Sequence, residues 1–81
     1  MCGDLKEMIE RELIPLVREA METAAGEGEE TREVELGELL ATFEEILSDI
    51  DAEIMDAWEC GELLEEFRRY RASGEILDRI S

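Results

Sequence analysis

The sequence has 81 residues, with 24 acidic side chains against 8 basic ones, no histidine and a formal net charge of −16. A chain of this length forms one small domain, whose modest core would gain from association. The acidic balance argues against direct binding to nucleic acid or anionic membranes, which requires a dense Lys and Arg surface, and makes a basic protein the natural partner.

The N-terminal part of the chain has the pattern of an amphipathic helix. From Asp4 to about Ala25, apolar residues recur at intervals of three and four, which is the period of one helical face. Asp4 is a candidate N-cap, and Glu7 would complete a capping box. Pro15 lies inside the pattern, where it removes a backbone N–H and clashes with the carbonyl four residues earlier. We therefore predict a kink at Pro15, or two short helices.

Residues 26–31 combine two glycines with several glutamates, and they predict a flexible acidic linker. The segment that follows is ambiguous, because Val34 and Leu36 alternate as in a strand while Thr31 is a candidate helix cap. No second strand candidate is available to pair with it. We expect a helix or an extended lead-in here.

The clearest helical pattern lies in the centre of the chain. Its apolar seam alternates steps of four and three, as in a coiled coil, and consists of Leu36, Leu40, Phe43, Leu47, Ile50, Ile54 and Ala57. This helix is expected to end around Cys60-Gly61 or to continue through it, since an internal glycine costs only about 1 kcal/mol.

A last helical face follows, at Leu63, Leu64, Phe67 and Tyr70, with one further turn or two suggested by Ile76, Leu77 and Ile80. Together these segments predict an all-α fold. We expect a single domain over residues 1–81, a small bundle of three to four helices. Its parts would be a Pro-kinked N-terminal helix, a long acidic central helix and one or two short C-terminal helices.

The negative charge is concentrated in one part of the chain. Residues 27–66 hold 16 acidic residues and a single base, Arg32. On the central helix, acids opposite the apolar seam form a predicted carboxylate stripe, namely Glu38, Glu45, Asp49, Asp56 and Glu59. At 1.5 Å per residue their steps span about 5–10 Å, comparable with the spacing of phosphates along a nucleic-acid strand. The alternative is a solvated face that only aids solubility.

No reactive or metal-binding motif is visible. Cys2 and Cys60 are too few and too separated for a zinc site or a disulfide framework, and whether they pair with each other is left open. Glu59 and Glu62 disfavour a Cys60 thiolate, so we expect a passive, partly buried cysteine. The alternating acids of residues 48–53 lack the glycine and the final glutamate of a calcium loop. We expect no metal, no cofactor and no catalysis.

The expected location follows from three features of the sequence. No apolar run approaches the roughly 18 residues of a membrane span, and the first residues lack a basic segment followed by an apolar one. The two cysteines do not require an oxidising compartment. We therefore expect a soluble protein of the cytoplasm.

These features predict a small inhibitor or regulator that occupies a basic, nucleic-acid-binding surface of a partner protein by phosphate mimicry. The candidate contact residues are eight acids and a tryptophan that is either an exposed anchor or the edge of the core: Glu38, Glu44, Glu45, Asp49, Asp51, Glu53, Asp56, Glu59 and Trp58. In composition the chain is similar to phage-encoded DNA mimics, anti-CRISPR proteins and nuclease immunity proteins, although no residue motif carries the likeness. The alternative is a helical oligomerisation or adaptor module, in which the seam from Leu36 to Ala57 pairs with a second copy or with another subunit.

Overall fold

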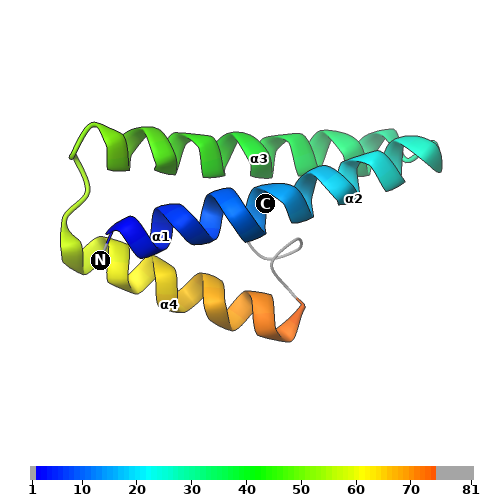
Figure 1. The fold of residues 1–81 in the computed structure, drawn as a ribbon. Helices are drawn as coiled ribbons and strands as arrows, with labels where there is room; N and C mark the ends of the chain where they lie inside the picture. The colour runs from blue at the N-terminus through cyan, green and yellow to red at the C-terminus, as the bar shows by residue number, and fades with distance from the viewer. Residues whose placement is uncertain (1, 75–81) are drawn as a thin grey trace.

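The computed structural model describes residues 2–74, and within them it is all-α, as predicted (Figure 1). Its elements are α1 (Cys2–Met8), the π-helical segment η1 (Ile9–Leu13), α2 (Ile14–Gly26), α3 (Glu30–Asp51) and α4 (Ala57–Ser73). The first three elements follow one another without a break. α3 packs along α2, and α4 packs along α1. The further turn suggested by Ile76, Leu77 and Ile80 lies outside the described residues.

The N-terminal helical segment contains a π-helical turn directly before Pro15. The N–H of Ile14 donates to the carbonyl of Ile9, five residues back, and Pro15 follows as the second residue of α2. A wide turn of this kind is one way for a helix to absorb an interruption in its hydrogen-bond ladder. The kink itself stays a prediction. The predicted cap is wrong, because α1 begins at Cys2 and Asp4 lies in its first turn, where a negative charge suits the helix dipole.

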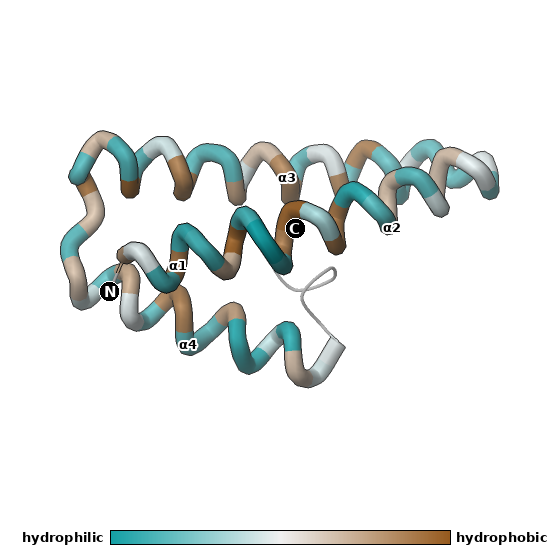
Figure 2. Tube along the Cα trace, viewed as in Figure 1, coloured by the Kyte–Doolittle hydropathy of each residue, from teal (hydrophilic) through white to brown (hydrophobic). Residues whose placement is uncertain are grey.

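In the core, the apolar face of the N-terminal helices packs against apolar side chains of α3 and α4. Figure 2 shows hydrophobic segments of α3 on the side that faces α1 and α2. The buried side chains are Leu5, Met8, Ile9, Leu13, Ile14, Val17, Ala24, Leu36, Leu39, Phe43, Cys60, Leu64 and Phe67. Burying one large apolar side chain contributes about 1.5–3 kcal/mol, so this cluster supplies the main stabilisation of the bundle.

The connection between α2 and α3 is shorter than the predicted linker of residues 26–31. Gly26 ends α2 and Glu30 begins α3, which leaves three residues between them. Gly28 has φ +73°, a conformation that glycine adopts at little cost, and the N–H of Glu29 donates to the carbonyl of Ala24 at 2.9 Å. Residues 31–36 are helical, which excludes the extended lead-in. The flexibility of this connection stays a prediction.

α3 ends earlier than its apolar seam predicted. The helix stops at Asp51, so Ile54 and Ala57 are not part of it. Glu53 lies in the left-handed region at φ +58°, its N–H donates to the carbonyl of Ile50, and the N–H of Ile54 donates to that of Asp49. These two bonds form a Schellman motif, which usually has glycine at the left-handed position. Because a glutamate occupies that position, the sequence contains no recognisable stop signal.

Candidate partner-binding surface

The predicted carboxylate stripe is divided between two helices in the structure. Glu38, Glu45 and Asp49 belong to α3, and their spacing of seven and four residues puts them on nearly the same side of it. Their Cα atoms are spaced along the axis by about 10 and 6 Å at the helical rise. Glu38 and Glu45 are exposed, and Asp49 is half-buried.

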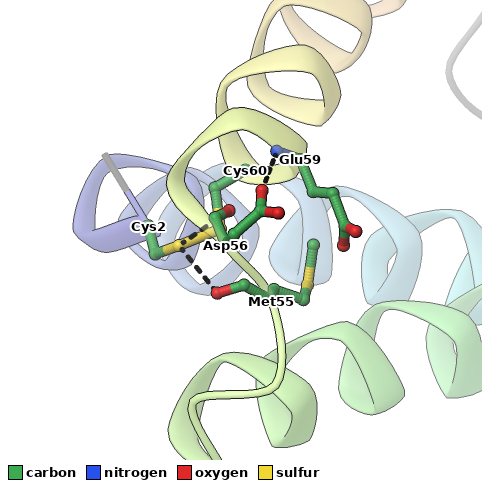
Figure 3. The surroundings of a disulfide bond; sticks show 5 residues. All are labelled: Cys2, Met55, Asp56, Glu59 and Cys60. Atoms are coloured by element: carbon green, nitrogen blue, oxygen red, sulfur yellow. Dashed lines mark hydrogen bonds between the residues drawn. A yellow bond between two sulfur atoms is a disulfide. The ribbon is translucent and has the colours of Figure 1, made fainter.

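Asp56 and Glu59 do not continue this row, because the chain leaves α3 at Asp51 and turns before α4 begins at Ala57. The prediction of one unbroken stripe is therefore wrong. Asp56 is the N-cap of α4, and its Oδ1 accepts a hydrogen bond from the N–H of Glu59 at 2.8 Å (Figure 3). Asp56, one of the carboxylates of the predicted stripe, therefore also stabilises the start of α4.

Two further predicted contact residues, Glu44 and Asp51, lie seven residues apart and share a side of α3 that differs from that of Glu45. The Nζ of Lys6 donates to Oδ1 of Asp51 at 3.0 Å and so links α1 to the end of α3. This hydrogen bond, followed by the attraction of Asp51 and Glu10, raises the pKa of Lys6. Asp51 is therefore already paired within the chain.

The corner between α3 and α4 consists of residues 52–59, which include the connection and the first residues of α4. It exposes two large apolar side chains, with Ile54 72% and Trp58 71% accessible. Of the two interpretations of Trp58, the exposed one agrees with the structure. Glu53, the remaining predicted contact residue, is also exposed in this corner.

A disulfide joins Cys2, at the start of α1, to Cys60 in the first turns of α4 (Figure 3). The Cα atoms of the two residues are 5.1 Å apart, and Cys60 is fully buried. Sγ of Cys2 lies 3.7 Å from the carbonyl oxygen of Asp56 and 3.9 Å from that of Met55; these are contacts, since a disulfide sulfur carries no proton. The pairing of Cys2 with Cys60, which the sequence left open, is thus present in the structure, and Cys60 is more deeply buried than the partly buried cysteine expected. Sequence spacing alone held no signal for the bond.

Residues 67–71 of α4 interleave two aromatic side chains with three arginines, a composition also found in nucleic-acid contacts. The structure accounts for the two aromatic residues as part of the packing. Phe67 is buried, and Tyr70 is half-buried with its hydroxyl donating to Oε1 of Glu66 at 3.1 Å. The three arginines between Phe67 and Ser73 are exposed. Nothing in this arrangement singles out a nucleic-acid contact.

Across residues 2–74, no charged side chain is buried, and no group of three or more His, Cys, Asp or Glu residues is arranged to hold a metal ion. None of the helices in this range is long and apolar enough to cross a membrane.

No protein family, no curated protein and no solved structure matches this chain. The surface must consequently be interpreted from its own residues. Its two distinguishing features are the acidic row Glu38, Glu45 and Asp49 on α3 and the apolar pair Ile54 and Trp58 at the corner.

Proposed function

We propose that this protein is a non-catalytic inhibitor or regulator that occupies a basic, nucleic-acid-binding surface of a partner protein. The observation that carries the proposal is the acidic row of α3, defined as Glu38, Glu45 and Asp49. Its residues are spaced by about 10 and 6 Å along the helix axis, and the shorter spacing is near the roughly 6–7 Å between successive phosphates of a nucleic-acid strand. Between Arg32 and Arg68 the sequence has no basic residue that would neutralise these charges.

From Glu33 to its end at Asp51, α3 carries acidic side chains and no basic one, which is not what stability alone would favour. Like charges four residues apart, such as Glu45 and Asp49, destabilise a helix by about 0.2–0.5 kcal/mol per pair. Interspersed lysines would remove this repulsion and still keep the helix soluble. A surface that retains this repulsion is consistent with a role in binding Lys and Arg side chains of a partner protein.

The binding mechanism is electrostatic. An anionic surface attracts a basic partner over about 8–10 Å at physiological salt and raises the rate of encounter. The complex would weaken as salt rises, and nucleic acid would compete with it for the same Lys and Arg side chains. No single carboxylate is expected to dominate, because each makes a solvated contact of small energy.

The test is capture from a native host lysate at low salt, with elution by stepwise salt and by added DNA or RNA. Three variants are compared: the wild type, Glu38→Gln/Glu45→Gln/Asp49→Asn, and the control Glu19→Gln/Glu22→Gln/Glu27→Gln, which removes the same charge from exposed positions elsewhere. We expect nucleic acid to displace the partner, and the α3 variant alone to lose at least tenfold in affinity. Equal losses in both variants, or no loss in either, would refute the phosphate-mimic proposal.

The alternative, an oligomerisation or adaptor module, has less support. Leu36 and Phe43 of the predicted seam are buried within this chain, and the seam is interrupted at Asp51. A homodimer through the Leu36–Ala57 seam would have to use its remaining members, of which Leu40, Leu47 and Ile50 are half-buried and Ile54 and Ala57 are exposed. Sedimentation of the wild type tests it, because a monomer at high concentration excludes self-association.

The predicted cytoplasmic location stays a prediction. Disulfides persist mainly in oxidising environments and are uncommon in the cytosol. The bond between Cys2 and Cys60 is therefore an observation against that location. Thiol alkylation of the protein in its native host, followed by mass analysis, would establish whether the bond is present there.

A further inference from the structure

The corner between α3 and α4 presents two large apolar side chains to solvent inside a strongly acidic segment. Ile54 and Trp58 are each more than 70% exposed, whereas the aromatic side chains of Phe43, Phe67 and Tyr70 are buried or half-buried. Residues 49–62 contain six acids and no base. Exposed apolar side chains with a charged surround are a common form of protein interaction site.

The backbone on both sides of this apolar pair is fixed by specific bonds. The N–H of Ile54 donates to the carbonyl of Asp49 at 3.0 Å, which closes the end of α3. Asp56 caps α4 through the N–H of Glu59, and the disulfide of Cys60 holds the first turns of that helix against α1. A segment that is already ordered loses little conformational entropy when it binds.

We propose that Ile54 and Trp58 are the apolar anchor through which this acidic corner binds a Lys/Arg-rich segment of a partner protein that carries apolar side chains of its own. The inference rests on the proposed function, since it assumes a basic partner. It goes further by assigning the short-range specificity of that binding to Ile54 and Trp58. Tryptophan is among the side chains that contribute most to protein interfaces when it becomes buried in them.

The negative charge around Ile54 and Trp58 favours a Lys/Arg-rich segment over other binding partners. A second copy of the chain would bring Glu53, Asp56 and Glu59 against the same residues of its partner, and like charges in contact oppose binding. Nucleic acid and anionic membranes would be repelled for the same reason. A basic segment instead satisfies the acids while its apolar side chains cover Ile54 and Trp58.

The test uses two synthetic 14-residue peptides of equal charge, each with six lysines and arginines. One peptide has a central Leu-Phe pair and the other has Ser-Gly at those positions. We expect wild-type protein to bind the Leu-Phe peptide at least fivefold more tightly by calorimetry, the size of effect expected for an interface side chain that matters. Trp58 is the single tryptophan of the chain, so its fluorescence should shift to shorter wavelength with that peptide only.

Matched variants separate the contribution of Ile54 and Trp58 to peptide affinity from the contribution of the general attraction between opposite charges. Ile54→Ser/Trp58→Ala should bring the affinity ratio of the two peptides close to one, while Val34→Ser, which changes an apolar residue 62% exposed on α3, should leave it unchanged. Both replaced side chains at the corner are exposed, so circular dichroism should show an intact fold.

The possible results distinguish the two proposals. If the double variant keeps the wild-type ratio, or if the Trp58 emission does not shift, the anchor is refuted while the electrostatic proposal stands. If wild-type protein binds neither peptide at low salt, the basic-partner proposal fails and the anchor fails with it. The fluorescence result depends on wild-type protein alone and is therefore independent of how the variants fold.

Discussion

The ring of Phe43 on α3 meets the ring of Phe67 on α4 edge to face, with their centroids 5.6 Å apart and their planes at 83°. Both side chains are almost completely buried. The contact joins two helices that are packed mainly on the N-terminal helical segment between them. It therefore adds a direct contact between α3 and α4.

Removing either ring should destabilise the whole domain. Phe67→Ala and Phe43→Ala are each expected to cost about 3–5 kcal/mol, because a large cavity is left in the core. That loss is a large part of the roughly 5–15 kcal/mol that stabilises a typical domain. Urea unfolding followed by circular dichroism measures it, with exposed Val34→Ala as the control. Losses below about 1 kcal/mol at both phenylalanines would contradict this core.

The disulfide is expected to be a major source of stability. It closes a loop with a sequence separation of 58, for which the loss of chain entropy in the unfolded state corresponds to about 4 kcal/mol. Reducing agent should lower the melting temperature of the wild type strongly. It should have no effect on Cys2→Ala/Cys60→Ala, which is expected to melt near the reduced wild type. Two alkylatable thiols in protein purified without reductant would contradict the bond.

Glu53 occupies a backbone conformation that favours glycine, so Glu53→Gly should be stabilising. A non-glycine residue in the left-handed region costs about 1–2 kcal/mol, and glycine gives back part of the gain through its more flexible unfolded state. We expect a net gain of about 0.5–1 kcal/mol in urea unfolding. Glu53→Ala serves as the control, because it removes the same charge but keeps the Cβ atom. A loss of stability specific to the glycine variant would show that the turn differs from the one described.

The ion pair between Lys6 and Asp51 predicts a pH dependence at alkaline pH. Its hydrogen bond raises the pKa of Lys6 in the folded protein above the ordinary value of 10.5. The stabilisation is therefore complete below that value and is lost as pH rises through the higher folded pKa. Urea unfolding of the wild type and Lys6→Gln from pH 8 to 12 tests the sign: their difference should shrink above about pH 10. A difference that grows with pH would contradict the pair.

The all-α class followed from the sequence alone, because apolar residues at intervals of three and four define a helical face wherever that face is packed. The length of the N-terminal helical segment followed in the same way, although its start moved from Asp4 to Cys2. Local glycines also located the turn after α2. These features depend on interactions between residues that are near each other in the chain.

The predicted carboxylate stripe was correct only for the residues that lie on α3. Glu38, Glu45 and Asp49 keep their predicted relation, whereas Asp56 and Glu59 do not, because the chain turns at Glu53 without a glycine to signal it. A periodic pattern cannot reveal a helix end that is made by backbone hydrogen bonds with an ordinary residue at the left-handed position.

What the sequence determined by itself was the helical class and the concentration of negative charge. Only the tertiary structure decided that Cys2 bonds to Cys60, that Asp51 pairs with Lys6 and that Trp58 faces solvent. Each of these relationships joins segments far apart in the chain or depends on which helix faces are covered. They arise from how α1, α3 and α4 pack, and no local pattern of residues encodes that packing.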